Sequence, residues 1–273
     1  VYMGLQKKRI TLAVISISIL LIVTTLGIFN SPIPFKRLRN TFDITKDLPK
    51  SDTIYGIDIS HYQGDIDWKT LGRDKDIAFV YLRASMGSEN KDCKAQEYAL
   101  DASKNGLLVG LYHFFYLQTD VKQQFENFDS VYSSIQSDLI PVLDIEAEKG
   151  RRRRPKTPPP GLCDSIQKFI DLFHEKYPNE TPAIYASQTF FNHYLSHRFQ
   201  QSLKWIANYS QYPVMRDSLV FHLWQYTDKA RIDGIKGCVD MNVIVRDDAL
   251  PLLRKKKDIN SMMQVELPTM PSK

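Results

Sequence analysis

Eight short apolar runs constrain the fold of this 273-residue chain more than any other feature of its sequence. The runs are rich in β-branched and aromatic residues and follow one another from Thr53 onward. Continuous apolar runs of this length suit strands that are covered on both faces, as in a parallel sheet. They read "IYGIDIS", "IAFVYLRAS", "LLVGLYHFFY", "LIPVLDIE", "PAIYAS", "LKWIANY", "VFHLWQYT" and "VDMNVIV".

Helical patterns lie between the early runs. The stretch "DCKAQEYALDASKNGL" ends with Asn105-Gly106, which is a helix stop signal. The stretches "DVKQQFENFDSVYSSI" and "CDSIQKFIDLFHEKY" carry apolar residues three and four positions apart, and one such stripe comprises Ile166, Phe169, Ile170 and Phe173. Strands that alternate with helices predict βαβ units and an α/β fold.

The spacing of the runs limits the kind of barrel. A full (β/α)₈ barrel takes about 250 residues, but only about 200 are available between residues 53 and 256. The last three runs lie too close together for crossover helices, because a crossover needs about a dozen residues. We therefore expect a shortened TIM-like barrel over residues 53–256 whose final strands lack full helices.

The segment "ITLAVISISILLIVTTLGIF" at residues 10–29 contains no charge. As a helix rising about 1.5 Å per residue it spans roughly 30 Å, the thickness of a bilayer core. Lys7, Lys8 and Arg9 precede it, so the positive-inside rule predicts a single-pass anchor with the barrel on the extracytoplasmic side. A cleaved signal peptide, which makes the protein secreted, is the alternative. Residues 1–30 then form a cytoplasmic tip and transmembrane helix, residues 31–52 a linker, and residues 257–273 a disordered tail.

Charge and cysteine content exclude some functions. The formal charge is +5, but much of it lies in three clusters, at residues 7–9, 151–154 and 254–257, and the remainder is slightly acidic. No broad basic face is expected, and the arginine run lacks interleaved stacking side chains, so no nucleic-acid partner is predicted. The three cysteines have no metal-like or redox-like spacing, and their odd number leaves at least one outside any disulfide.

Polar side chains gather where the predicted strands end. In barrels of this kind the active site lies at the carboxyl ends of the strands. Four carboxylates beside aromatic and amide groups are typical of a carbohydrate site. The sequence holds no metal-ligand set, phosphate loop or nucleophile elbow, so no metal or cofactor is predicted. The strand-end residues are Asp58, Ser60, Arg83, Ser85, His113, Asp144, Glu146, Tyr185, Asn208, Gln225, Tyr226 and Asp240.

Asp144 and Glu146 are two positions apart on one strand, so both carboxyl groups point to the same side. Crowding them raises the affinity of one for a proton, as general acid catalysis requires. Glycoside hydrolysis uses one carboxyl group to protonate the leaving oxygen and another negative group to stabilise the developing positive charge. We expect Glu146, nearer the mouth, to be the acid and Asp144 its partner. A pair that caps loops or binds an arginine is the alternative.

The motifs "YGIDISHYQGDIDW", "PVLDIE", "IYAS", "WIANY", "WQYT" and "VDMNV" resemble those of the glycoside hydrolase family 25 lysozymes, the Chalaropsis-type muramidases. The resemblance runs from about Tyr55 to Val245 and keeps the order of the motifs. It implies a flattened (β/α)₅(β)₃ barrel and cleavage of the β-1,4 bond between N-acetylmuramic acid and N-acetylglucosamine in peptidoglycan. It also implies a bacterial cytoplasmic membrane for the anchor, with the barrel on the periplasmic or cell-surface side.

The resemblance also assigns residues. It implies Glu146 as the general acid/base, Asp144 as its partner, and Asp58 and Asp240 as further carboxylates of the site. Retention of anomeric configuration is implied, with either the substrate's acetamido group or a carboxylate as nucleophile. His61 and His113 are expected to be framework histidines. The substrate wall that the resemblance implies comprises Tyr62, Tyr112, Tyr185, Trp205, Asn208, Trp224 and Gln225.

Two other functions stay open from the sequence. One is a hydrolase of a chitin-like polymer with the same acidic strand end, and the other is a non-catalytic peptidoglycan-binding protein. The four intact carboxylates argue against the second. The basic, proline-rich loop around Arg151–Arg154 departs from the usual family pattern. We expect either a solvated insertion or a segment that attracts anionic wall polymer. In the second case, replacing these arginines with serine weakens binding to intact walls in a salt-dependent way.

Overall fold

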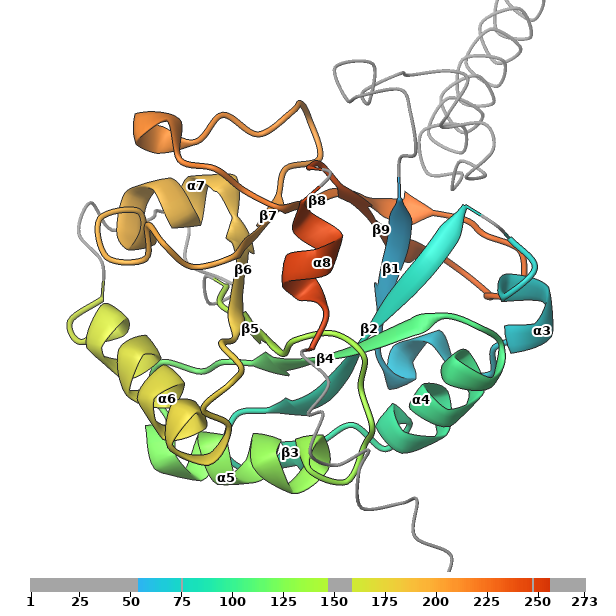
Figure 1. Cartoon of the computed structure of the whole chain (residues 1–273), viewed down its shortest axis with the longest axis horizontal. Helices are drawn as coiled ribbons and strands as arrows, with labels where there is room; N and C mark the ends of the chain where they lie inside the picture. The colour runs from blue at the N-terminus through green and yellow to red at the C-terminus, as the bar shows by residue number, and fades with distance from the viewer. Residues whose placement is uncertain (1–53, 75, 147–158, 247, 256–273) are drawn as a thin grey trace, which may run out of the picture.

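A computed structural model describes residues 54–74, 76–146, 159–246 and 248–255 of the chain, which form a closed barrel (Figure 1). All eight apolar runs are strands, as predicted, and a two-residue strand β3 (Asn90–Lys91) pairs with the end of β2. The barrel strands are β1 (Tyr55–Ile59), β2 (Ile77–Met86), β4 (Leu108–Phe114), β5 (Val142–Asp144), β6 (Ala183–Ser187), β7 (Lys204–Ala207), β8 (Leu223–Ala230) and β9 (Val239–Ile244).

The strands follow one another around the barrel in chain order. Each barrel strand from β1 to β7 pairs in parallel with the next barrel strand, and β9 lies antiparallel between β8 and β1. The pairing of β1 with β2 closes the ring. Asp58 and Asp240 are directly opposite each other in the β1–β9 pair, which confirms that closure brings the first and last carboxylates together.

Full helices cover only the early half of the barrel, as the spacing predicted. The helices α4, α5 and α6 occupy the three predicted stretches, whereas the connections after β6 hold only short turns. This is the shortened barrel expected from the sequence. The helices are α3 (Trp68–Leu71), α4 (Ala95–Lys104), α5 (Val121–Tyr132), α6 (Leu162–Lys176), α7 (Gln188–Phe190) and α8 (Ala249–Leu253), with short turns η1 (His61–Gln63), η2 (Phe191–Leu195) and η3 (Arg216–Ser218).

Local sequence signals set the ends of these elements. Helix α4 stops at Asn105, and Gly106 follows with φ 84°, a conformation that glycine adopts without strain. Helix α5 begins after Asp120, whose carboxylate accepts the Gln123 N–H at 2.9 Å. The turn η1 was not expected from the sequence. Ser60 caps it, because its side chain accepts the Tyr62 N–H and its own N–H donates to the Gln63 side chain.

The barrel has two cores. Side chains that point out of the strands, such as Val80 and Leu82, pack with the predicted α6 stripe beneath the helices. Side chains that point inward, such as Phe79 and Trp205, fill the barrel itself. The continuous apolar runs are therefore buried on both faces, because successive strand residues point to opposite sides and both sides are covered.

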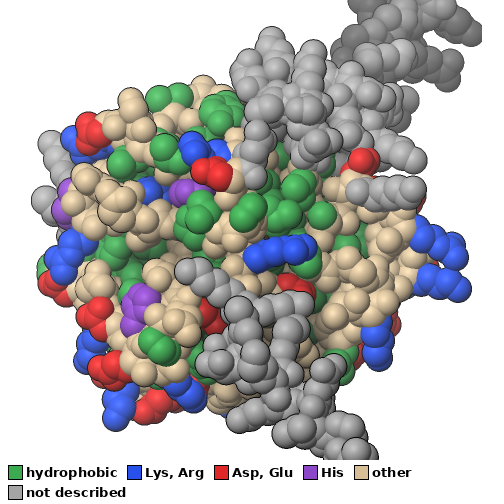
Figure 2. Space-filling view, in the orientation of Figure 1, with side chains coloured by type: hydrophobic (Ala, Val, Ile, Leu, Met, Phe, Trp, Pro, Cys, Tyr) green, Lys and Arg blue, Asp and Glu red, His purple; other side chains and the backbone are tan. Residues whose placement is uncertain are grey.

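Helix α8 covers the amino-terminal end of the barrel. In Figure 1 it lies in front of the centre of the barrel. Ala249 and Leu253 belong to the inward-facing core, and the Leu253 carbonyl accepts the Ile140 N–H at 2.8 Å. Figure 2 shows this face with hydrophobic side chains around α8 and charges of both signs toward the edge. Among the described residues seen there, lysines and arginines form no broad basic area. The opposite end of the barrel is left for a site.

Several predictions fall outside the described residues: the anchor at residues 10–29, the linker, the Arg151–Arg154 loop and the tail after residue 256. Within the described residues, every helix is too short or too polar to cross a bilayer. All three cysteines are described, and each is a free thiol. The disulfide that the sequence left open is therefore not formed.

Candidate active site

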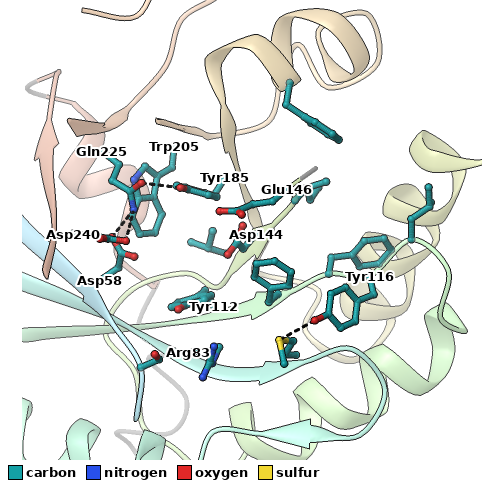
Figure 3. Close-up of a pocket in the computed structure, with 18 of the residues that line it drawn as sticks. Asp58, Arg83, Tyr112, Tyr116, Asp144, Glu146, Tyr185, Trp205, Gln225 and Asp240 are labelled. Atoms are coloured by element: carbon teal, nitrogen blue, oxygen red, sulfur yellow. Dashed lines mark hydrogen bonds between the residues drawn. The ribbon is translucent and has the colours of Figure 1, made fainter. Parts of the chain in front are cut away.

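A cleft of about 1190 Å³ opens at the carboxyl ends of the strands, where the sequence predicted a site (Figure 3). All four predicted carboxylates line it: Asp58 from β1, Asp144 from β5, Glu146 just beyond β5, and Asp240 from β9. The carboxyl ends of the parallel strands meet at one rim, and the antiparallel β9 brings its amino end, with Asp240, to the same rim. Residues up to 182 positions apart in sequence therefore share one cavity.

Asp144 and Glu146 enter the cleft together but differ in burial. Asp144 is 8% exposed, whereas Glu146 is exposed at the mouth, as expected from its position further along the strand. The Asp144 Oδ1 atom is buried and has no hydrogen-bond partner among the described residues. Burial raises the pKa of Asp144 well above its ordinary value, and the Glu146 carboxyl adds to this, while Arg83 opposes it.

Asp58 and Asp240 form a second acidic pair. The Asp58 Oδ2 atom accepts the amide N–H groups of Gln225 and Asn242, each at 2.8 Å. Burial raises the pKa of Asp240 to about 9, and the neighbouring Asp58 charge adds to the shift. Burial also raises the pKa of Asp58, while its hydrogen bonds to Asn242 and Gln225 lower it. The pair therefore holds a proton at neutral pH, with Asp58 the member that accepts more amide hydrogen bonds.

Five of the seven predicted wall residues line the cleft. Tyr62 stands on the rim with 76% of its surface exposed, and its ring offers a flat apolar face. The hydroxyl of Tyr185 donates to Gln225 at 2.7 Å, and the indole N–H of Trp205 donates to Asn242 at 2.8 Å. The five are Tyr62, Tyr112, Tyr185, Trp205 and Gln225.

The structure places Trp224 and Asn208, the other two predicted wall residues, outside the lining of the cleft. Trp224 is adjacent to Gln225 on β8, and neighbouring strand residues point to opposite faces, so Trp224 packs in the outer core, fully buried. Asn208 likewise follows Ala207, which faces inward. Its side chain ties loops together by donating to Gln188 at 2.6 Å and accepting from Ser210.

Arg83 lines the cleft and was predicted to lie at a strand end, but no role was predicted for it. Its guanidinium donates to Asp92 Oδ2, from Nε at 3.1 Å and from Nη2 at 3.0 Å, and lies 5.1 Å from the centre of the Tyr62 ring. Asp92 is buried, which raises its pKa, but hydrogen bonds from His61 and the Arg83 charge lower it overall. His61, Asp92 and Cys93 bring three ligand atoms within 4.8 Å. Since the Arg83 guanidinium already forms a salt bridge with the Asp92 carboxylate, this cluster fits a cation poorly.

His113 is a framework residue, as expected. It is fully buried, Ser85 and Gln124 lie at hydrogen-bond distance from its two ring nitrogens, and burial lowers its pKa to about 4.

Other residues of the site were missed by the sequence analysis. Asn242 is two positions after Asp240 and so shares its face, and Tyr209 belongs to the "WIANY" motif, so both carried a signal. Tyr116 is the last residue of the run "LLVGLYHFFY", so its position at a predicted strand end was also a signal.

The comparisons with known proteins agree on one family. The family model described as glycosyl hydrolases family 25 matches residues 57–235. The protein YegX of Escherichia coli K12 is 30% identical over 200 residues, which cover 72% of this chain and 71% of YegX. Lysozyme M1 of Streptomyces globisporus is 26% identical over 206 residues, which cover 69% of this chain and 67% of the lysozyme.

A solved structure shares the fold. The family 25 glycosyl hydrolase from Bacillus anthracis superposes with a TM-score of 0.62 at 25% identity, over 74% of this chain and 92% of that one. The matched region of the family model contains three of the four cleft carboxylates, and Asp240 lies just beyond it. The chain therefore belongs to the glycosyl hydrolases of family 25, and the resemblance seen in its motifs is confirmed.

Proposed function

We propose that this glycoside hydrolase is a muramidase that cleaves the β-1,4 bond between N-acetylmuramic acid and N-acetylglucosamine in peptidoglycan. Lysozyme M1, which matches most of the chain, supports the substrate class. The roles of individual residues rest on the geometry of the cleft. Glu146 acts as general acid and then general base, and Asp144 is its stabilising partner.

One observation carries this assignment. Asp144 is a buried carboxyl group with an unpartnered oxygen, beside an exposed Glu146, in a cleft wide enough for a glycan chain. An unpartnered buried oxygen is costly for the fold. A substrate N–H or O–H group that enters the cleft relieves this cost, which is typical of a group kept for binding or catalysis.

The first chemical step follows from the two environments. Glu146 is at the mouth, where it reaches the glycosidic oxygen of a chain that lies along the cleft. It transfers its proton to that oxygen as the bond to the sugar's anomeric carbon breaks, and the leaving sugar departs with the new hydroxyl group. In the second step Glu146, now ionised, takes a proton from the water that attacks the anomeric carbon.

The identity of the nucleophile follows from the burial of Asp144. Its pKa is raised, first by burial, and its Oδ1 receives no hydrogen bond from the described residues, so the charged form that would attack carbon is poorly stabilised. We therefore favour attack by the substrate's own acetamido oxygen. Asp144 then accepts the acetamido N–H and stabilises the positive ring as it forms. Direct attack by the carboxylate is the alternative, and each route retains the anomeric configuration.

The experiment compares the purified chain with its Glu146→Gln variant on purified peptidoglycan. Released ends are reduced with borohydride and identified by mass spectrometry. We expect new reducing N-acetylmuramic acid ends from the parent chain and at least a hundredfold fewer from the variant, because the amide has no proton to transfer. A glutamine at this exposed position should leave the melting temperature unchanged.

Other outcomes select other functions. New N-acetylglucosamine ends, or equal activity on chitin oligomers, mean a different glycosidic bond. Wall binding without release from the folded parent chain means a non-catalytic binding protein. A substrate that lacks the acetyl group separates the two nucleophiles. With the acetamido route, substrates that carry an unacetylated amine should react far more slowly than acetylated ones; equal rates contradict that route.

We also propose that residues 10–29 anchor the barrel at the outer face of the cytoplasmic membrane. The uncharged length of the segment and the basic residues before it support this. Alkaline carbonate extraction of membranes should leave the protein in the pellet, and protease added from outside should degrade the barrel. A protein of lower mass in the soluble fraction instead means a cleaved signal peptide.

A further inference from the structure

The side-chain amide of Gln225 has its whole hydrogen-bonding capacity taken up inside the protein. An amide offers two N–H donors and an oxygen with two lone pairs. The Gln225 oxygen accepts the hydroxyls of Tyr185 at 2.7 Å and Tyr209 at 2.6 Å. Its nitrogen donates to Asp58 at 2.8 Å and Asp240 at 3.4 Å. These four contacts use all four positions, and Gln225 is only 1% exposed. Figure 3 shows its contacts with Tyr185, Asp58 and Asp240.

The partners also fix which way the amide points. Two ionisable acids lie on one side and two phenol hydroxyls on the other. A flipped amide would place its oxygen against the carboxylates and its N–H groups against hydroxyls that could no longer donate to it. The observed orientation is the one in which every group has a complementary partner.

We propose that Gln225 is a positioning residue of the hydrolase and not a substrate contact. It holds Asp58 as the ionised member of its pair with Asp240, and it accepts the hydroxyl hydrogen bonds of Tyr185, which lines the cleft, and of Tyr209. The Tyr185 oxygen then accepts a hydrogen bond from a substrate N–H or O–H group and does not donate to it. This refines the proposed function by assigning a chemical preference to one wall of the cleft.

The contacts of Asp58 support the first half of the proposal. Its Oδ2 receives two N–H donors, from Gln225 and Asn242, and two donors on one oxygen favour the ionised form. Asp240 faces it across the strand pair, shares a side-chain hydrogen bond with Asp58, and has the longer of the two Gln225 contacts. Two adjacent carboxylates repel each other, so only one of the pair ionises readily and the proton stays on Asp240. The raised pKa of Asp240, about 9, agrees with this.

The test uses Gln225→Met, which keeps the length of the side chain but makes none of the four hydrogen bonds. We expect kcat to fall about tenfold to a hundredfold, the range found when the outer partner of a functional group is removed, while KM changes less than threefold. The matched control is Gln167→Met on the outer face of α6, where the amide bonds only Asp171, and its kinetics should equal those of the parent.

A second variant, Gln225→Glu, reports on charge. Ionised, the new carboxyl cannot donate to Asp58 or Asp240 and adds a negative charge, but protonated it can donate once. The optimum of kcat/KM should therefore move to lower pH by about one unit or more. The titratable groups that face position 225, and that set this profile together, are Asp58, Asp240, Asp228, Asp144, Glu146, Tyr185 and Tyr209.

Three results overturn the proposal: a rise in KM with kcat unchanged, which identifies a substrate contact; parent-like kinetics in a folded Gln225→Met; or an unshifted pH profile in Gln225→Glu. A parent chain without hydrolase activity refutes the proposed function but leaves this inference testable. Carboxyl ¹³C NMR then decides it. Asp58 should titrate at higher pH in Gln225→Met than in the parent, and superimposable titration curves overturn the inference.

Discussion

At the scale of single residues, the acidic cleft works against the stability of the fold. Asp58, Asp144 and Asp240 all have raised pKa values, for which burial is the largest cause. A carboxyl group with a raised pKa in the native state holds its proton while the unfolded chain releases it. Stability from such groups is therefore present at low pH and is lost as the pH rises. Function requires the cluster, and its stability cost is typical of active sites.

Asp240→Asn should make this cost visible. The asparagine stays neutral and can still donate to Asp58. Near pH 4 the native Asp240 is also neutral, so the two proteins should have similar free energies of unfolding. Between about pH 4, where the unfolded aspartate ionises, and about pH 9, its native pKa, the parent alone loses stability. We expect the variant to be about 1–2 kcal/mol more stable at pH 8 and much less active.

The measurement is urea unfolding at several pH values, with activity assayed in parallel. Asp171→Asn is the control, since Asp171 is exposed on α6 and its charge is not among those that raise the pKa of Asp240. It should change the free energy of unfolding by less than about 0.5 kcal/mol at every pH. A gain in Asp240→Asn that stays constant with pH would contradict the role given to the proton on Asp240.

At the scale of elements, two glycines make room for aromatic rings inside the barrel. A Cβ atom on Gly110 of β4 would lie 2.2 Å from the Tyr81 ring, and one on Gly56 of β1 would lie 2.3 Å from the Phe79 ring. The Tyr81 hydroxyl also donates to the Ile140 carbonyl at 3.2 Å, which fixes the ring in place. These small residues are needed because large ones fill the neighbouring strand.

Gly110→Ala should therefore destabilise the barrel by about 1–3 kcal/mol, the range for an added methyl group in a packed core. Thermal unfolding measures this. In a double-mutant cycle, Tyr81→Leu removes the ring and should offset part of the loss, so the two changes should be less than additive. Tyr81→Phe removes only the hydroxyl and keeps the clash. Its effect should add to that of Gly110→Ala; equal rescue by both substitutions would be inconsistent with a steric cause.

At the scale of the whole molecule, one end of the barrel is covered by a helix and the other end holds the cleft. Helix α8 covers the amino-terminal end through Leu253, which is 1% exposed and packs in the inward-facing core. Beyond it, the Lys255 ammonium lies 4.0 Å from the Tyr132 ring centre and 3.5 Å from Glu180, which ties the segment to α5 and to the loop after α6. The end of the barrel opposite the cleft is therefore closed by packed side chains.

Leu253→Ala should lower the free energy of unfolding by about 2–5 kcal/mol, because it leaves a cavity beneath α8. The melting temperature should fall, while KM at a temperature below unfolding stays the same, since the cleft is at the other end. Leu252→Ala is the matched control: Leu252 is 49% exposed on the same helix and should change stability by less than about 0.5 kcal/mol. Equal effects of the two substitutions would mean that α8 does not cap the barrel.

The sequence predicted the eight strands and the three full helices because each is marked by local periodicity and by stop signals such as Asn105-Gly106. It also predicted the four carboxylates, since every one of them lies at a strand's end or just beyond it. It assigned Trp224 and Gln225 to one wall, although neighbours on a strand cannot share a face. Both residues were assigned to the wall from the family resemblance. The alternation of side chains along the strand places Gln225 in the cleft and Trp224 in the outer core.

The sequence by itself determined the barrel, the place of its active site and the family, because periodic burial and ordered motifs are properties of the chain read in one dimension. Only the tertiary structure decided what each polar group does. The saturated amide of Gln225, the unpartnered oxygen of Asp144 and the Arg83–Asp92 pair depend on contacts between strands and loops that are distant in sequence. Hydrogen bonds and pKa shifts act over a few ångströms, so they are defined only once the barrel has closed.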